Sequence, residues 1–372
     1  MDTRIMKKLG ITNSLLGLGC MRLPTLSDGS IDYEHGQRMI DYALEHGITY
    51  FDTALVYHGG ESETFLGKVL CSRHKRDSYT IATKLPVGRF NTLEECKEAL
   101  ETALNRLQTS YIDFYLLHGI SYEAFKRAKG MGVLDWMVEL KAKGIIKHIC
   151  FSTHDTPANV IKILDEFPFE FCQMQLNYLD WEMQDAKTLY AYLAEHEIPI
   201  IVMEPVRGGR LMTIEGPKVD ALKALDPSAS LAKWALRFVA DLPAVSVILS
   251  GMSNMEQLKE NIETFSPIAP LTKEEHEAIA AVREEILAVP VVPCTGCNYC
   301  DVCPQQIAIP DIFTRYNDYL RFGDLNGLKR AKQQIDPARW ADQCIGCGAC
   351  KAECPQHIDI PELMKKIAEL VG

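Results

Sequence analysis

The chain has 372 residues, of which 47% are hydrophobic and 24% charged, and its formal net charge is −11. This length predicts two domains, one of them large, with the hydrophobic share of an ordinary globular protein. The acidic balance argues against a nucleic-acid ligand, and no apolar run approaches the roughly 20 residues of a membrane span. The start, Met1-Asp2-Thr3-Arg4, carries no secretory signal. We therefore expect a cytoplasmic protein that binds neither nucleic acid nor membrane.

The first 285 residues alternate between short β-branched or aromatic runs and amphipathic stretches. The candidate strands are 15–19, 49–52, 80–84, 114–118, 147–152, 171–175, 199–203 and 245–249. The candidate helices are 34–45, 62–70, 93–106, 134–143, 158–165, 186–195 and 229–239. Eight strands with crossovers in about 250 residues predict an α/β fold, a (β/α)8 TIM barrel. The alternative, an open doubly wound sheet, would want a Gly-rich dinucleotide loop that G-L-G-C-M-R at 17–22 does not match.

Polar residues stand at the carboxyl ends of four successive predicted strands. Asp52, Lys84, His118 and Ser152 are separated by 32, 34 and 34 residues, one β/α unit each. In a barrel they converge on the rim where such enzymes place their chemistry. Tyr57 follows Asp52 in a glycine-containing loop that can fold over the mouth. Ionisable residues are costly as core filling, so the set predicts an active site.

Eight of the 13 cysteines form two runs of similar spacing near the end of the chain. The runs are Cys294-x2-Cys297-x2-Cys300-x2-Cys303-Pro304 and Cys344-x2-Cys347-x2-Cys350-x3-Cys354-Pro355. Each continues in the same way, as C-P-Q-Q-I-A-I-P-D and C-P-Q-H-I-D-I-P-E. Such duplicated thiolate sets are typical of iron–sulfur proteins. Structural zinc more often uses two separated C-x2-C pairs, and a disulfide framework suits a small secreted domain.

The assignment of the fourth cysteine in each run determines which four thiolates bind the same cluster. In two-cluster ferredoxins that cysteine binds the other cluster. The crossed assignment gives one [4Fe–4S] cluster Cys294, Cys297, Cys300 and Cys354, and the other Cys344, Cys347, Cys350 and Cys303. The first run is one residue shorter before its last cysteine. This difference leaves the crossing, and the presence of two clusters rather than one, open.

The segment between the two runs has a helical pattern. Apolar residues recur near helical spacing at Ile312, Phe313, Tyr316, Tyr319 and Leu320. Each I-P-[DE] sequence sets proline and an acid where a helix would begin. We therefore expect a barrel domain at 1–285 and a small α-helical domain at 286–372. The latter resembles the all-helical dicluster ferredoxin domains of respiratory complexes and heterodisulfide reductases.

Several sequences in the barrel resemble the aldo-keto reductase superfamily. They are F-D-T-A-L-V-Y (51–57), G-G-E-S-E-T-F-L-G (59–67), I-A-T-K (81–84), Y-L-L-H-G (115–119) and F-S-T-H (151–154). With the cysteine tail, the chain resembles the ferredoxin-fused branch of bacteria and archaea. All four members of the catalytic tetrad match, as Asp52, Tyr57, Lys84 and His118. The resemblance implies NAD(P)H-linked reduction of a small carbonyl compound, or the reverse oxidation of an alcohol.

The tetrad implies a way to deliver the proton. A free tyrosine, with a pKa near ~10, is a weak acid at neutrality. The Lys84 ammonium, held by Asp52, is expected to lower the pKa of Tyr57 and so make it an effective general acid. His118 would orient the carbonyl and donate to the developing alkoxide.

The resemblance also implies the nucleotide site. The expected residues are Ser152, Gln173, Met203, Gly208, Gly209, Leu211, Gly251, Ser253, Gln257 and Asn261. Ser152 and Gln173 would hold the nicotinamide carboxamide. NADPH-specific relatives carry lysine, serine and arginine near the 2′-phosphate, where this chain has Gly251, Met252 and Gln257. Because phosphate prefers bidentate cations, the cofactor is either NADPH or NADH.

The role of the cysteine tail admits three interpretations, because nicotinamide exchanges a hydride whereas a cluster exchanges single electrons. In the first, the barrel and the clusters both take part in the oxidoreductase reaction, and a ferredoxin-like or other redox protein is a partner. In the second, the clusters only stabilise the tail or sense oxygen. In the third, the barrel is a nucleotide-sensing or electron-carrying subunit, which an intact Tyr57–Lys84 pair argues against. Among the other cysteines, Cys20 ends the first predicted strand and is interpreted as a buried structural thiol.

Overall fold

The computed structural model describes residues 1–294, 296–354 and 356–372. Pro355, part of the second cysteine motif, lies outside the described residues. By its contacts the chain forms two compact units, Met1–Met212 with Leu222–Ile279, and Thr213–Ala221 with Ala280–Gly372. The predicted domain boundary after residue 285 therefore stays a prediction, since the second unit also includes a short segment from the middle of the chain.

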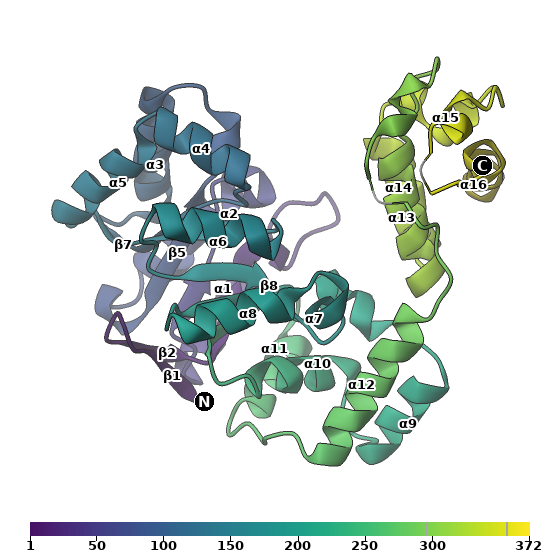
Figure 1. Cartoon of the computed structure of the whole chain (residues 1–372). Coiled ribbons are helices and arrows are strands. Elements are labelled where there is room, and N and C mark those ends of the chain that lie inside the picture. Colours follow the sequence, from purple (N-terminus) through teal and green to yellow (C-terminus); the bar gives the residue numbers. More distant parts are fainter. Residues whose placement is uncertain (295, 355) are drawn as a thin grey trace. The chain divides into compact units, whose positions relative to one another are not determined.

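The first unit is built on a closed barrel of eight parallel strands in the order β10-β3-β4-β5-β6-β7-β8-β9. Figure 1 shows strands of this unit among its helices. The barrel strands are β3 (Leu16–Gly19), β4 (Tyr50–Asp52), β5 (Thr80–Leu85), β6 (Ile112–Leu117), β7 (Ile146–Thr153), β8 (Cys172–Gln175), β9 (Ile200–Met203) and β10 (Val245–Ser250). Each predicted strand overlaps one of them. Nearly all of their residues are buried, as expected of parallel strands covered by helices. The predicted (β/α)8 barrel is confirmed.

Helices surround this barrel. They are α1 (Tyr33–Glu45), α2 (Glu61–Leu66), α3 (Leu93–Leu107), α4 (Tyr122–Gly130), α5 (Val133–Ala142), α6 (Pro157–Glu166), α7 (Asp180–Met183), α8 (Ala186–Glu195), α10 (Leu231–Ala240) and α11 (Met255–Thr264). A capping box begins α3, in which Thr92 accepts from the Glu95 amide and the Glu95 carboxylate accepts from the Thr92 amide. Helices α9 (Pro217–Leu225) and α12 (Lys273–Leu287) each contain residues of both units. The predictions missed α4, α7, α9, α11 and α12.

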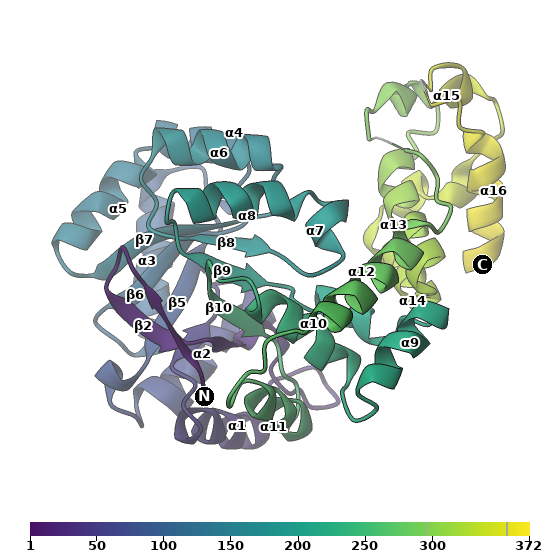
Figure 2. The same cartoon turned by 60° about the horizontal axis from the view of Figure 1, so that its bottom comes forward.

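An antiparallel hairpin, which the sequence did not predict, precedes the barrel. It consists of β1 (Thr3–Met6) and β2 (Ile11–Ser14) (Figure 2). Met6 belongs to a buried cluster with Tyr50, Phe114 and Val247 from the barrel strands. The hairpin thus covers the amino end of the barrel. A catalytic site is therefore expected at the carboxyl end.

The second unit contains α13 (Ile309–Phe322), α14 (Leu325–Gln334), α15 (Ala349–Ala352) and α16 (Ile360–Val371). Its core includes the fully buried Trp340 and Met364. Pro310 and Pro361 lie in the first turns of α13 and α16, as the two I-P-[DE] sequences predicted. No helix in the described part of the chain is long and apolar enough to cross a membrane.

Truncation of Phe114 should destabilise the barrel. Its ring is fully buried, with ring centroids 5.5 Å from Tyr50 and 5.2 Å from Phe171. We expect Phe114→Ala to lower the free energy of unfolding by about 3–5 kcal/mol, measured by urea titration. Val138→Ala is the control, because Val138 is 49% exposed on α5. A loss below about 1 kcal/mol in Phe114→Ala would contradict this packing.

Candidate active site and cysteine-lined hollows

Lys84 is at the centre of a buried polar group at the carboxyl end of the barrel. It lies on β5, and its Nζ donates to Asp52 Oδ1 at 2.6 Å, the Thr53 carbonyl at 2.7 Å and the Tyr57 hydroxyl at 3.3 Å. Asp52 ends β4, the strand beside β5. Three of the predicted tetrad residues therefore touch one another, as convergence of parallel strand ends requires.

Lys84 and Asp52 form an ion pair that is buried away from water. The side chain of Lys84 is 0% exposed and that of Asp52 4%. Burial lowers the pKa of Lys84, but Asp52 and Tyr57 outweigh it, so that the net pKa is raised and the ammonium persists. Burial also raises the pKa of Asp52, and Lys84 offsets part of that rise. Removing either partner would leave an uncompensated buried charge.

Tyr57 lies in a turn, Tyr57–Gly60, between β4 and α2. Burial raises the pKa of Tyr57 above its ordinary value, while the charge and hydrogen bond of Lys84 lower it. Burial outweighs Lys84, so the net direction of the pKa of Tyr57 is upward. Lys84 lowers the pKa of Tyr57 in the expected direction, and the opposing effect of burial becomes known only from the structure.

His118 follows β6 directly and faces Tyr57. Their ring centroids are 5.8 Å apart in an edge-to-face arrangement. Burial, followed by the charges of Lys84, His154 and Arg89, lowers the pKa of His118 to about 3. The imidazole is therefore neutral near pH 7, with one N–H to donate. Two hydrogen-bond donors, the Tyr57 hydroxyl and this ring, can thus meet one acceptor oxygen.

Ser152 and Gln173 lie opposite each other on β7 and β8. The Ser152 hydroxyl accepts from the Gly119 amide at 2.8 Å, and Gln173 Nε2 lies 3.9 Å from the sulfur of Met203. The buried Gln173 Oε1 has no hydrogen-bond partner among the described residues. A buried amide oxygen of this kind needs an N–H donor, and a carboxamide group supplies one.

The loop after β9 contains three residues predicted to bind the nucleotide, Gly208, Gly209 and Leu211. Gly208 and Gly209 both have left-handed backbone, with φ of 63° and 94°, and Leu211 is buried. A glycine-rich loop of this shape lets a ligand approach the backbone closely. The neighbouring Arg207 forms a buried ion pair with Asp180.

The remaining predicted nucleotide residues cluster at the start of α11. Gln257 Oε1 accepts from the Ser253 amide at 2.8 Å. Asn261 is buried, and its amide donates to the Ser250 hydroxyl at 3.0 Å, which secures the end of β10. The nucleotide-binding roles of all these residues stay predictions.

The sequence interpretation missed Arg22, which belongs to the same loop cluster. A Cβ on Gly251 would lie 2.8 Å from Arg22 Cγ, so the glycine makes room for the arginine. The Ser253 hydroxyl donates to the Arg22 carbonyl at 2.8 Å. Arg22, from the segment after β3, therefore lies against the loop in which the sequence lacks the lysine and arginine of NADPH-specific relatives. The only signal in the sequence was the position of Arg22 shortly after a strand end.

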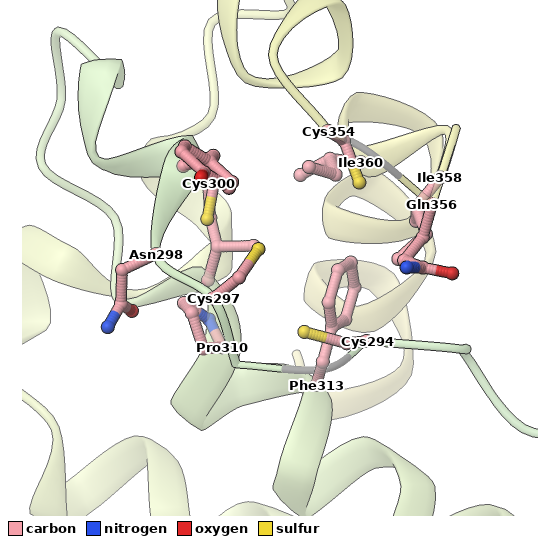
Figure 3. A pocket seen from close by; sticks show the side chains of 12 residues that line it. Cys294, Cys297, Asn298, Cys300, Pro310, Phe313, Cys354, Gln356, Ile358 and Ile360 are labelled. Carbon is pink, nitrogen blue, oxygen red and sulfur yellow. The ribbon is translucent and has the colours of Figure 1, made fainter.

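The eight tail cysteines surround two hollows within the second unit. Cys294, Cys297, Cys300 and Cys354 line the first hollow, and Figure 3 shows their sulfur atoms around one space. Cys303, Cys344, Cys347 and Cys350 line the second hollow. Among the described residues, no three His, Cys, Asp or Glu side chains are grouped for a single metal ion.

In each hollow, neighbouring sulfurs raise the pKa of one thiol. Burial, then the charges of Cys294, Asp301 and Cys297, raises the pKa of Cys300 to about 11. Burial, then Cys303, Cys344 and Cys347, raises that of Cys350. Four thiolates in one apolar hollow need a cationic centre to offset this repulsion, and iron supplies it. The donor set fits a cluster.

Comparisons with known proteins agree with both parts of the chain. A model of the aldo/keto reductase family matches residues 15–284, and a 4Fe-4S dicluster domain matches residues 293–358. An uncharacterized oxidoreductase, YqkF of Bacillus subtilis, is 30% identical over 73% of this chain and 94% of its own. The L-galactose dehydrogenase of Arabidopsis thaliana is 25% identical over 73% and 90%. Among solved structures, aldo-keto reductase AKR11C1 from Bacillus halodurans is similar, with a TM-score of 0.63, 28% identity and coverage of 76% and 96%.

The low pKa of His118 predicts a pH dependence of stability. The folded pKa of about 3 lies below the ordinary value of 6.5, so the unfolded chain binds more protons between them. The stabilisation is fully present above pH ~6.5 and is lost as the pH falls toward 3. Between pH 7.5 and 5 the free energy of unfolding, measured by urea titration, should decrease for both proteins. We expect the decrease to be about 1–2 kcal/mol smaller in His118→Gln than in wild type. The exposed His46 provides a control, His46→Gln. Equal losses in wild type and His118→Gln would contradict a neutral, buried imidazole.

Proposed function

The chain belongs to the aldo/keto reductase family, and we propose that it is an NAD(P)H-linked carbonyl reductase with two [4Fe–4S] clusters that transfer electrons. One observation carries the catalytic part. The Tyr57 hydroxyl lies 3.3 Å from the buried ammonium of Lys84, which lies 2.6 Å from Asp52. The reverse reaction, oxidation of an alcohol, uses the same residues.

In the proposed reaction, side chains of the protein transfer the proton. Tyr57 donates its hydroxyl proton to the carbonyl oxygen, and Lys84 stabilises the phenolate that remains. The neutral His118 donates a hydrogen bond to the same oxygen and orients it. Asp52 keeps Lys84 charged. A bound nicotinamide supplies the hydride.

The orphaned Gln173 Oε1 supports nucleotide binding, because it offers a buried acceptor for a carboxamide N–H. Ser152 beside it offers a hydroxyl, and Gly208, Gly209 and Leu211 form the expected pyrophosphate loop. Gly251, Ser253, Gln257 and Asn261 would border the adenosine end. Arg22 gives this end a guanidinium and so supports acceptance of the 2′-phosphate of NADPH, while NADH remains open.

The two hollows support the crossed assignment of cysteines. Cys354 lines the hollow of the first run, and Cys303 lines that of the second. Each cluster would exchange single electrons. Cys297 and Cys347 are exposed, which supports access by a ferredoxin-like or other redox partner. Exposed thiolates of this kind suit a reducing cytoplasm.

A structural role for the clusters is the second candidate. Cys300, Cys303 and Cys350 are buried within the hydrophobic core of the second unit. A core this small usually needs a metal, a disulfide or another covalent constraint for stability. This observation favours clusters that hold the unit together, with or without electron transfer.

Replacement of Tyr57 tests the catalytic proposal. Tyr57→Phe removes the proton donor and should lower kcat for a simple aldehyde by about 10²–10⁴-fold. Binding of NADPH or NADH, followed by fluorescence, should be unchanged. Tyr122→Phe is the matched control, because the Tyr122 hydroxyl donates to Glu166 on the surface. A kcat of Tyr57→Phe equal to wild type would exclude Tyr57 as the acid.

Pairs of cysteine substitutions test the cluster assignment. Wild type purified without oxygen should hold roughly eight irons and eight sulfides. Under the crossed assignment, Cys297→Ser with Cys354→Ser should lose no more iron than either single variant, because both affect one cluster. Cys297→Ser with Cys303→Ser should lose both clusters. The opposite result would establish the uncrossed pairing. Cys71→Ser, a half-buried cysteine of the barrel, is the control.

A further inference from the structure

The turn that carries Tyr57 has an unfavourable backbone. His58, Gly59 and Gly60 are successive left-handed residues, with φ of 49°, 65° and 99°. A left-handed conformation is unfavourable for a residue with a Cβ, such as His58. Contacts from outside the turn must therefore stabilise it.

Arg106, near the end of α3, provides such contacts. Its Nη1 donates to the carbonyl of Leu55, two residues before Tyr57, at 3.3 Å. Its guanidinium also occupies the space beside Gly60, where a Cβ would lie 2.6 Å from Nη1. The same side chain thus touches the chain on both sides of Tyr57. The Arg106 carbonyl lies 2.0 Å from where a Cβ of Gly67 would be, so the residue that follows α2 packs its backbone against that of α3.

A buried carboxylate connects Arg106 to the strand of Lys84. Glu63 on α2 is 0% exposed. Its Oε2 lies 3.4 Å from Arg106 Nη1, and its Oε1 accepts from the Thr83 hydroxyl at 2.6 Å. Thr83 is the neighbour of Lys84 on β5. A buried carboxylate is kept only when paired, so Glu63 fixes α2 and α3 to that strand.

A second buried contact ties α2 to the strand of Asp52. The Ser62 hydroxyl donates to the Cys20 carbonyl at 3.0 Å and lies 2.8 Å from the Thr53 hydroxyl. Thr53 follows Asp52, and its carbonyl accepts from Lys84. One partner of each residue, Thr53 for Ser62 and Thr83 for Glu63, is therefore a sequence neighbour of a tetrad residue.

We propose that Arg106 and Glu63 are positioning residues for the reaction, which hold the Tyr57 turn so that its hydroxyl stays in reach of Lys84. This inference rests on the proposed function for its effect on turnover. Neither residue touches the reacting atoms. Their substitution should therefore change kcat and local mobility, and leave nucleotide binding unchanged.

The experiment compares Arg106→Met, Arg106→Lys and Glu63→Gln with wild type. Arg106→Met keeps most of the stem and loses the guanidinium, so kcat should fall about 10–100-fold. Hydrogen exchange of residues 55–60 should rise about tenfold, while that of α11 stays unchanged. The dissociation constant of NADPH should change by less than about twofold. Arg106→Lys, which keeps a cation, should recover part of kcat.

Arg38→Met is the matched control, because the exposed Arg38 pairs with Glu34 one turn away on α1. Glu63→Gln has nearly the shape of the carboxylate and replaces Arg106→Met if that variant does not fold. Wild-type exchange in residues 55–60 of the folded variants would overturn the proposal, as would an unchanged kcat. If wild type reduces no carbonyl, the proposed function fails, and exchange alone still decides whether Arg106 and Glu63 hold the turn.

Discussion

The active site depends on the need to stabilise one buried ammonium. Lys84 has almost no access to water, and an isolated charge there would cost several kcal/mol. Its three hydrogen-bond partners come from Asp52, Thr53 and Tyr57, which lie within six residues of one another. The segment after β4 must therefore fold back across the end of β5. The need to provide hydrogen-bond partners for Lys84 therefore determines where Tyr57 lies.

The second unit has a different constraint. Its hollows bring several thiols together in a small hydrophobic core, and the neighbouring sulfurs disfavour the thiolates that iron binds. An iron–sulfur centre reverses this balance, since its positive charge stabilises the thiolates. Binding of the clusters and folding of this unit are thereby coupled. A structural role and an electron-transfer role for the same clusters are compatible.

Much of the fold and site followed from regularities of sequence. Asp52, Lys84 and His118 could be predicted to converge because parallel strand ends share one edge of a barrel. The hairpin of β1 and β2 was not predicted, because it precedes the β/α alternation and its strands, T-R-I-M and I-T-N-S, mix polar with apolar residues. Arg22 meets Gly251 across more than 200 residues, a contact that no local pattern encodes. The upward pKa of Tyr57 depends on burial, which becomes known only when the loops are in place.

The barrel site groups a buried ammonium, a tyrosine hydroxyl and an imidazole, an arrangement that suits proton transfer. Cys20, the cysteine that ends up beside the tetrad, is fully buried at the end of β3. Burial, and then the charge of Asp52, raises the pKa of its thiol. A protonated, inaccessible thiol is a poor redox group. The contacts around Lys84 therefore suit the control of a proton, whereas the cysteines of the second unit suit an iron–sulfur centre.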